Sequence, residues 1–289
     1  MHILSKRLSP LWAILFVSGL TACGKTEVAT PQETKPDVAQ AQVLKVGSDI
    51  TFPPFEYMVD NKPEGFDIDL MNGILKQSNA SADFIDTRFS NLISGLEGKK
   101  FDAVISGMYI TSERLMKVDM IPYFKSTESV VVLSDSIYKP KVRDDLCGKT
   151  IATQKGSLFP DQLNQMSKES CLAKGKAAIT VREFDTSPQA IQAVLAKAAD
   201  AQYDDTSVAK TAVKKLNNRV EITSTEPFFP FIGGIVVRKG DTETYNRVYD
   251  GLEKMKASGE YDALIQKYDL IAPTADEIKT FMAQVQKKS

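Results

Sequence analysis

The chain has 289 residues, with 36 Lys and Arg against 37 Asp and Glu, so its formal charge at pH 7 is −1. This balance argues against a nucleic-acid-binding protein, which would carry a clustered basic surface. The one His and the one Trp, His2 and Trp12, lie at the N-terminus. If that N-terminus is removed, imidazole-dependent nucleophiles, general bases and zinc sites are excluded.

Residues 1–22 have the features of an export signal peptide. Lys6 and Arg7 precede an apolar run at 11–20, which is too short for a membrane-spanning helix of about 20 apolar residues. The run ends in Leu-Thr-Ala-Cys at 20–23, which resembles the lipobox of bacterial lipoproteins. We therefore expect a lipidated Cys23 that anchors the mature chain in the bilayer. An ordinary signal peptide followed by a chance Cys is the alternative.

Residues 23–41 contain no aromatic residue and no apolar periodicity, so a disordered tether is predicted between the lipid and the folded body. Two further cysteines follow, Cys147 and Cys171. In an exported protein such a pair is most simply a disulfide, which would stabilise the fold by about 3 kcal/mol. Two free buried thiols are the alternative, and no metal site is expected from two thiols without His.

From residue 43 onward, strand-like and helix-like segments alternate, which predicts α/β sheets with helices on both faces. Short apolar runs predict strands at 43–46, 101–105, 150–153, 179–181, 201–203 and 235–237. Capping residues predict helices that begin at Asp67, Thr111 and Ser187-Pro188. Apolar spacing predicts a further helix that contains Leu163 and Met166. It also predicts a helix near the C-terminus whose single apolar face carries Tyr245, Val248, Tyr249, Leu252 and Met255.

Polar residues and a glycine follow several of these strands. In α/β sheets, ligands bind beyond the carboxyl ends of the strands. This places Asp49, Gly107, Gln154 and Asp205 among the candidate site residues. Asp204, next to Asp205, is expected to point away from the site into solvent.

Four segments then match one family in order and spacing. They are Phe-Pro-Pro-Phe at 52–55, Gly-Phe-Asp-Ile-Asp-Leu at 65–70, Ser-Gly-Met-Tyr-Ile-Thr-Ser-Glu-Arg at 106–114 and Gly-Lys-Thr-Ile-Ala-Thr-Gln-Lys-Gly at 148–156. Together they resemble the polar amino-acid-binding proteins of bacterial ABC importers (solute-binding protein family 3), over residues 42–270. The resemblance implies a two-lobed, periplasmic-binding-protein-like fold of type II. Lobe 1 would comprise 42–132 plus 228–289, lobe 2 would comprise 133–227, and a two-stranded hinge would join them.

The resemblance also implies how a free amino acid is held. Arg114 matches the arginine that binds the ligand carboxylate, for which a planar guanidinium can donate two parallel hydrogen bonds. Asp205 matches the aspartate that binds the ammonium, together with the backbone carbonyl of Gly107. The alternatives are a surface arginine and an aspartate that only caps the next helix.

Further residues are implied around the ligand side chain. Phe52 and Phe89 match the two flanking aromatic residues, although either fits a plain core position. Asp49 lies where the family reads the distal polar group, with hydrogen bonding within its own turn as the alternative. Gln154 and Ser157 would contribute from lobe 2.

One position departs from the family pattern. Tyr109 stands where Thr or Ser is usual, and Leu158 and Phe159 replace polar residues after the loop glycine. A tyrosine hydroxyl reaches much farther than a threonine hydroxyl. Tyr109 is therefore predicted either to form a third aromatic wall or to narrow the cleft and select a smaller ligand.

The expected function is a receptor that captures a free cationic or neutral polar L-amino acid and delivers it to an ABC permease. Asp49 would repel a distal carboxylate, and aromatic rings favour a cation. The alternatives are a fold-related enzyme similar to cyclohexadienyl dehydratase and a surface lipoprotein without a small ligand. We expect a monomer on the periplasmic or cell-surface side, with no catalytic residues and no cofactor. A site built from Arg114, Asp205, Asp49 and phenylalanines would contain no group that titrates near neutral pH.

Overall fold

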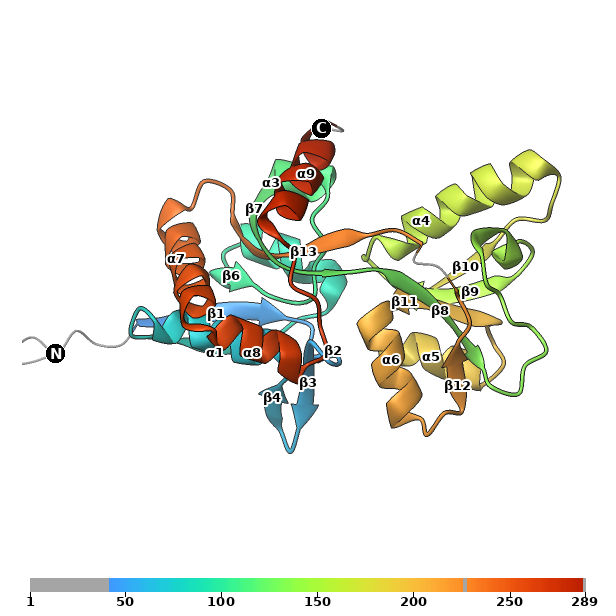
Figure 1. Ribbon diagram of the computed structural model, residues 1–289, viewed down its shortest axis with the longest axis horizontal. Coiled ribbons are helices and arrows are strands. Elements are labelled where there is room, and N and C mark those ends of the chain that lie inside the picture. Colours follow the sequence, from blue (N-terminus) through green and yellow to red (C-terminus); the bar gives the residue numbers. More distant parts are fainter. Residues whose placement is uncertain (1–41, 226–227, 288–289) are drawn as a thin grey trace, which may run out of the picture. The chain divides into compact units, whose positions relative to one another are not determined.

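The computed structural model describes residues 42–225 and 228–287 (Figure 1). The predicted signal peptide, Cys23 and nearly all of the predicted tether lie outside these residues. Within the described part of the chain, no helix combines the length and the apolar character needed to cross a membrane.

The first sheet has five strands in the order β5-β1-β6-β13-β7. Strand β1 pairs in parallel with β5 and with the central strand β6, whereas β13 pairs antiparallel with β6 and β7. The strands are β1 (Gln42–Ser48), β5 (Ala80–Asp86), β6 (Ala103–Val104), β7 (Val118–Ser126) and β13 (Phe231–Arg238). A small sheet of β2 (Thr51–Phe52), β3 (Glu56–Val59) and β4 (Lys62–Glu64) follows β1.

The second sheet also has five strands, in the order β10-β9-β11-β8-β12. Strand β9 pairs in parallel with β10 and β11, and β8 pairs antiparallel with β11 and β12. The strands are β8 (Glu128–Leu133), β9 (Thr150–Gln154), β10 (Thr180–Phe184), β11 (Ala201–Asp205) and β12 (Val220–Ile222).

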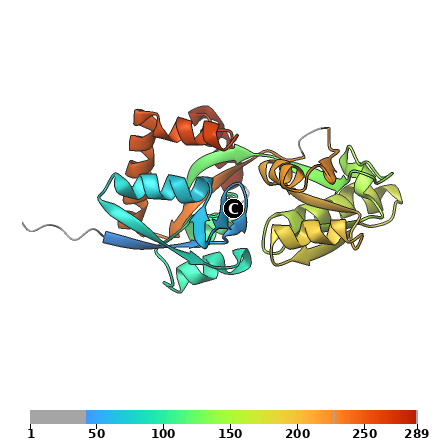
Figure 2. The same ribbon diagram turned by 90° about the horizontal axis from the view of Figure 1, so that it is seen from below.

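Helices cover both faces of the first sheet, as Figure 2 shows for α1 and α2. The alternation of side chains in the short strand β6 explains the two layers: Ala103 belongs to the core under α1 and α7, and its neighbour Val104 belongs to the core under α2. The first-sheet helices are α1 (Phe66–Lys76), α2 (Leu92–Glu97), α3 (Ser112–Lys117), α7 (Thr242–Ser258), α8 (Glu260–Lys267) and α9 (Ala275–Gln286).

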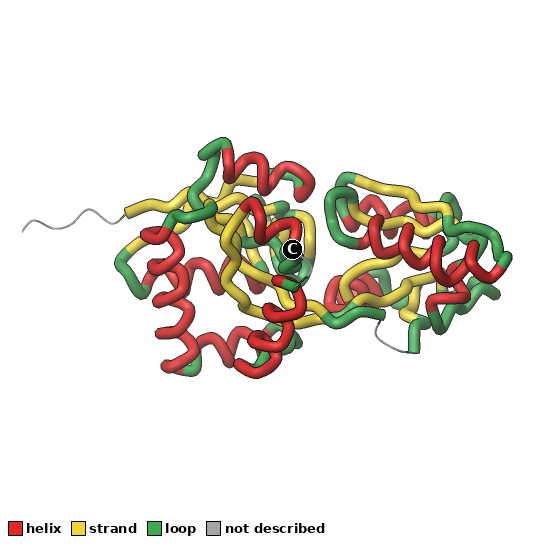
Figure 3. Tube along the Cα trace, turned by 90° about the horizontal axis from the view of Figure 1, so that it is seen from above, coloured by secondary structure: helices red, strands yellow, loops and turns green. Residues whose placement is uncertain are grey.

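The second sheet carries α4 (Phe159–Met166), α5 (Ser187–Leu195) and α6 (Thr206–Lys215). We refer to the elements around the first sheet as lobe 1 and those around the second sheet as lobe 2. Both combine strands and helices (Figure 3), which confirms the predicted α/β class.

The chain passes between the sheets twice. It leaves β7 at Ser126 and enters β8 at Glu128, and it returns between the end of β12 and the start of β13. The lobe boundaries at 132/133 and 227/228 remain predictions.

Three local predictions differ from the structure. Asp67 does not cap α1: Gly65 precedes the helix, and Asp67 is fully buried in its first turn. The predicted strand at 101–105 is reduced to Ala103–Val104. Helix α5 is capped by Thr186 rather than Ser187, because the Thr186 hydroxyl accepts the N–H of Gln189 in a capping box.

The two cysteines of the described chain form a disulfide. Cys147 and Cys171 are joined with their Cα atoms 5.4 Å apart, within the range that a disulfide requires. The bond ties the segment before β9 to the end of the helical stretch after α4, and thus braces lobe 2.

Candidate functional site

Seven of the nine predicted ligand-binding residues line one small cavity between elements of the two lobes. They are Phe52, Phe89, Gly107, Tyr109, Arg114, Gln154 and Ser157, and they are joined there by Leu158 and Phe159. The volume open to water is ≈ 10 Å³, about the space of one water molecule. An amino acid therefore needs the cavity to open before it can enter.

Arg114 lies in the short helix α3, which Thr111 caps by accepting the N–H of Arg114 on its hydroxyl. The guanidinium donates to two carbonyls, Nη1 to Tyr109 at 2.7 Å and Nη2 to Gly156 of lobe 2 at 3.2 Å. Its carbon lies 5.4 Å from the centre of the Phe89 ring. Burial lowers the pKa of Arg114 to about 10, so it remains a cation at neutral pH. It can therefore exchange its carbonyl partners for a carboxylate.

Asp205 ends β11 and caps α6, as the alternative prediction stated. Its Oδ1 accepts the N–H groups of Ser207 at 2.6 Å and Val208 at 3.2 Å. Its Oδ2 accepts the hydroxyl of Tyr109 from lobe 1 at 3.0 Å. Asp205 is fully buried and does not itself line the cavity. Its link to the cavity is the hydroxyl of Tyr109, which lines the cavity.

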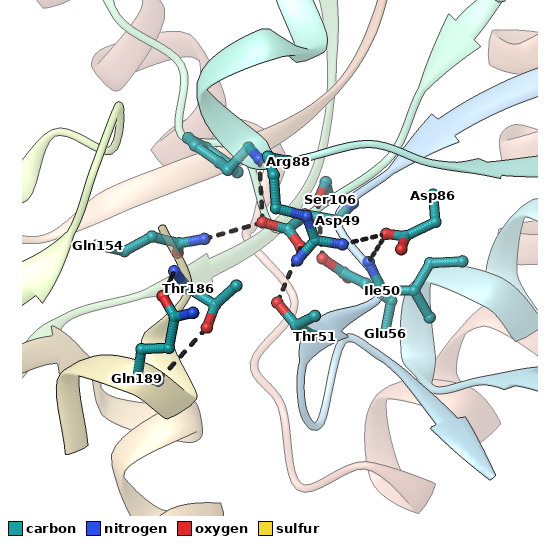
Figure 4. A network of polar contacts seen from close by, with 11 residues as sticks. Asp49, Ile50, Thr51, Glu56, Asp86, Arg88, Ser106, Gln154, Thr186 and Gln189 are labelled. Carbon is teal, nitrogen blue, oxygen red and sulfur yellow. Dashed lines mark hydrogen bonds and ion pairs between the residues drawn. The ribbon is translucent and has the colours of Figure 1, made fainter. Parts of the chain in front are cut away.

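Asp49 is also fully buried and does not line the cavity. Figure 4 shows the network around it. Its Oδ1 accepts the Thr51 hydroxyl at 2.8 Å and lies 2.8 Å from Nη1 of Arg88. Its Oδ2 accepts the N–H of Phe89 at 2.9 Å and Nε2 of Gln154 at 3.1 Å. Both oxygens are thus engaged by protein donors, and of these only Thr51 belongs to the turn of Asp49 itself.

Gly107 has a left-handed backbone with φ of 53°, and an added Cβ would lie 3.2 Å from the Phe52 ring. Its N–H donates to Oδ2 of Asp67 at 2.8 Å, and the hydroxyl of Tyr123 donates to the same oxygen at 2.9 Å. Glycine is required here by conformation. The buried Asp67 sets the orientation of the loop.

The lobe 2 side of the cavity is a tight loop after β9. The hydroxyl of Ser157 donates to the carbonyl of Gln154 at 2.6 Å and accepts the N–H of Phe159 at 3.2 Å. The Phe159 ring packs edge-on against Tyr109, with centroids 5.6 Å apart. The aromatic wall therefore includes Phe159, which the sequence analysis did not assign to the site.

Three buried carboxyl groups outside the predicted site residues have pKa values near neutral pH. Burial raises the pKa of Asp67 to about 6, and it raises the pKa values of Glu128 and Asp204 to about 7. Asp204 is fully buried, so its predicted exposure is wrong. It accepts the Ser187 hydroxyl, the Gln202 amide and the N–H of Asp205 at 2.8 Å.

A larger cavity of ≈ 550 Å³ lies among β7, β13, α6 and α9. None of the nine predicted residues lines it. It holds Lys125 and Glu277, which pair with each other at 2.6 Å. Among the described residues, no group of His, Cys, Asp and Glu is arranged to hold a metal ion.

Arg88 is a residue of the network beside the cavity that the sequence motifs did not indicate. It lies just before Phe89 in the sequence and reaches Asp49 and Asp86, residues that end or follow different strands. The sequence did contain a sign of this ion pair, because Asp49 and Arg88 each follow a strand, and the parallel neighbouring strands β1 and β5 end at the same edge of the sheet. The pairing could have been proposed once their adjacency was assumed.

Comparison with known proteins agrees with this architecture. Residues 44–270 match the model of the bacterial extracellular solute-binding proteins, family 3. The chain is 26% identical over 269 residues to the L-cystine-binding protein TcyJ of Escherichia coli K12, covering 92% of this chain and 96% of that protein. It is 30% identical over 253 residues to a probable histidine-binding protein of Neisseria gonorrhoeae, covering 86% and 90%.

Among solved structures, an ancestral arginine-binding protein bound to arginine matches with a TM-score of 0.71 and 35% identity, covering 78% of this chain and 97% of that chain. The family match spans both sheets and ends before α9. The two-lobed solute-binding fold that the four motifs implied is thereby confirmed. The chain belongs to family 3 of the bacterial extracellular solute-binding proteins.

Proposed function

We propose that this chain is an extracytoplasmic receptor that captures a free polar L-amino acid and delivers it to an ABC importer. The observation that carries the proposal is the position of Arg114. Its guanidinium faces a cavity lined by Phe52 and Phe89 and donates to a carbonyl of the opposite lobe. A ligand carboxylate can replace these carbonyl acceptors with stronger, charge-assisted hydrogen bonds.

The ligand's ammonium is assigned to Asp205. This carboxylate is fully buried, and an ammonium would offset the desolvation of its charge better than neutral donors do. Capture would proceed by closure of the two lobes around the ligand, as in other hinge-closing binding proteins. Gly107, Gln154 and Ser157 complete the proposed site as cavity-lining residues.

Both cationic and neutral side chains suit the proposed site. The aromatic rings of Phe52, Phe89 and Phe159 favour a cation or a polarisable group. Asp49 does not add a free negative charge, because Arg88 neutralises it. The relatives named above are described as binding cystine, histidine and arginine, a range that covers both classes.

Binding without catalysis is proposed because the described residues that line the cavity include no carboxyl group to act as a general acid. We also propose that Cys23 is lipidated and holds the receptor on the periplasmic or cell-surface side. Three features support this anchor: the basic N-terminus, the short apolar run and the Leu-Thr-Ala-Cys sequence. We propose that the receptor is a monomer. The disulfide in lobe 2 is compatible with an oxidising compartment outside the cytoplasm.

A calorimetric screen of the mature chain without Cys23 against the common L-amino acids and L-cystine tests the function. At least one ligand should bind with micromolar or tighter affinity. Arg114→Lys should weaken that binding at least about tenfold, equivalent to roughly 1.4 kcal/mol, because Lys cannot donate two parallel bonds. Arg247→Lys is the matched control, since Arg247 pairs with Glu243 on α7. Equal affinities for the two variants would contradict the role of Arg114.

A further inference from the structure

The cavity between the lobes is closed by the protein's own hydrogen bonds. Three of them cross from one lobe to the other: Tyr109 to Asp205 at 3.0 Å, Arg114 to Gly156 at 3.2 Å and Gln154 to Asp49 at 3.1 Å. With ≈ 10 Å³ of free volume between them, these contacts hold together the surfaces that a ligand would separate.

Of these three hydrogen bonds, the one from Tyr109 ends on the carboxylate that is proposed to bind the ligand's ammonium. Every described donor to Asp205 is neutral: two backbone N–H groups and the hydroxyls of Ser126 and Tyr109. Burial still raises the pKa of Asp205, because neutral donors only partly offset the loss of water. A cation at the Tyr109 hydroxyl position would satisfy this carboxylate better.

The hydroxyl of Tyr109 is held in place by its surroundings. The ring stacks on Phe231 of β13 and meets the Phe159 ring edge-on. The Tyr109 carbonyl accepts Nη1 of Arg114 at 2.7 Å. The residue therefore connects the proposed carboxylate-binding group to the proposed ammonium-binding group.

We propose that Tyr109 is a built-in competitor of the ligand, a latch whose hydroxyl occupies the ammonium position on Asp205 and holds the lobes together when no ligand is bound. The inference rests on the proposed function in one respect, namely that the ligand's ammonium binds Asp205. The ligand must displace the hydroxyl, so its apparent affinity is reduced by the fraction of latched molecules. The factor is the same for every ligand whose ammonium takes this position, because it depends only on the ligand-free protein.

Tyr109→Phe tests the latch, because it removes the hydroxyl and keeps the ring that packs on Phe231. Tyr203→Phe is the matched control: Tyr203 is a fully buried tyrosine of lobe 2 whose hydroxyl has no hydrogen-bond partner. Small-angle X-ray scattering of both variants and the wild type without ligand measures lobe closure. Calorimetry with L-arginine, L-histidine and L-cystine as probes measures affinity.

The wild type and Tyr203→Phe should share a compact ligand-free state, and Tyr109→Phe should have a larger radius of gyration. Any probe that binds should bind Tyr109→Phe about tenfold more tightly than it binds the wild type. A ligand-free radius that the Tyr109→Phe change leaves unaltered, or an affinity that is unchanged or weakened, overturns the latch. If no probe binds any of the proteins, the proposed amino-acid specificity fails, while the scattering comparison still decides whether the latch exists.

Discussion

Arg88 forms an ion pair with the fully buried Asp49, with Nη1 and Oδ1 2.8 Å apart. The arginine side chain is 32% exposed and reaches inward from the segment after β5. Burial, and to a smaller extent the charge of Asp86, raise the pKa of Asp49, while Thr51, Arg88 and the Phe89 N–H act against this rise. Asp49 therefore serves as an internal anchor for the start of the Phe89 segment, and not as a free charge for the ligand.

Arg88→Met should destabilise the protein by about 2 kcal/mol, because the buried Asp49 loses its only cationic neighbour among the described residues. Urea denaturation measures the loss. Asp86→Asn is the control, since it removes only the outer, 55% exposed partner of Arg88, for which a change within about 0.5 kcal/mol is expected. Equal effects of the two substitutions would show that Asp49 does not depend on Arg88.

Asp204 should make the fold less stable as the pH rises from 5 to 8. Its pKa is raised to about 7, first by burial, so between the unfolded value near 4 and the folded value the native state holds a proton that unfolding releases. Above pH 7 the native state has to carry the buried carboxylate charge, and the loss of stability levels off. The difference in unfolding free energy between Asp204→Asn and the wild type should therefore depend on pH. Between pH 5 and pH 8 it should shift in favour of the variant by about 1–3 kcal/mol.

Thermal unfolding of both proteins at the two pH values measures this difference. Asp144→Asn is the control, because hydrogen bonds from Lys174 and Lys176 lower the pKa of Asp144, and its contribution does not change between pH 5 and 8. If the wild type and Asp204→Asn show the same pH dependence, Asp204 is not protonated in the native state.

Removal of the disulfide should destabilise lobe 2. The bond joins residues separated by 24 positions, so replacing both Cys147 and Cys171 with Ser should cost about 3 kcal/mol and lower Tm by roughly 6–12 °C. Differential scanning calorimetry of the double variant measures the change. Reduction of the wild type with dithiothreitol should lower its Tm similarly and leave the double variant unchanged. An unchanged Tm in both cases would mean that the bond does not constrain the unfolded chain.

Cys23→Ala should release the protein from membranes in the native host. Without the thiol no acyl chain can be attached at this position, and the attraction of the acyl chains to the bilayer is lost. Fractionation followed by immunoblotting measures the distribution between membrane and soluble material. Cys147→Ser/Cys171→Ser serves as a control for loss of cysteine elsewhere and should remain with the membrane. A Cys23→Ala protein that still sediments with membranes contradicts the lipobox interpretation.

Much of the molecule was predictable from local patterns. Apolar runs and caps located most strands and helices, including the Thr111 cap of α3, because these signals depend on neighbouring residues alone. The motif around Arg114 likewise placed it at the cavity. Phe52, Phe89, Gly107 and Gln154 line the same cavity, and their contact with a ligand stays a prediction.

The remaining features were decided by tertiary structure, because they depend on residues far apart in the chain. The α/β class follows from the sequence alone, and the export signal and the ligand-binding role of Arg114 are predictions that also rest on the sequence alone. Three features follow only from the folding of distant segments against each other. Arg88 neutralises Asp49, Asp204 is buried, and the Tyr109 hydroxyl reaches Asp205. The raised pKa values of Asp67, Glu128 and Asp204, which lie outside the predicted site residues, were likewise decided by tertiary structure, because the surrounding core removes water from these carboxyl groups.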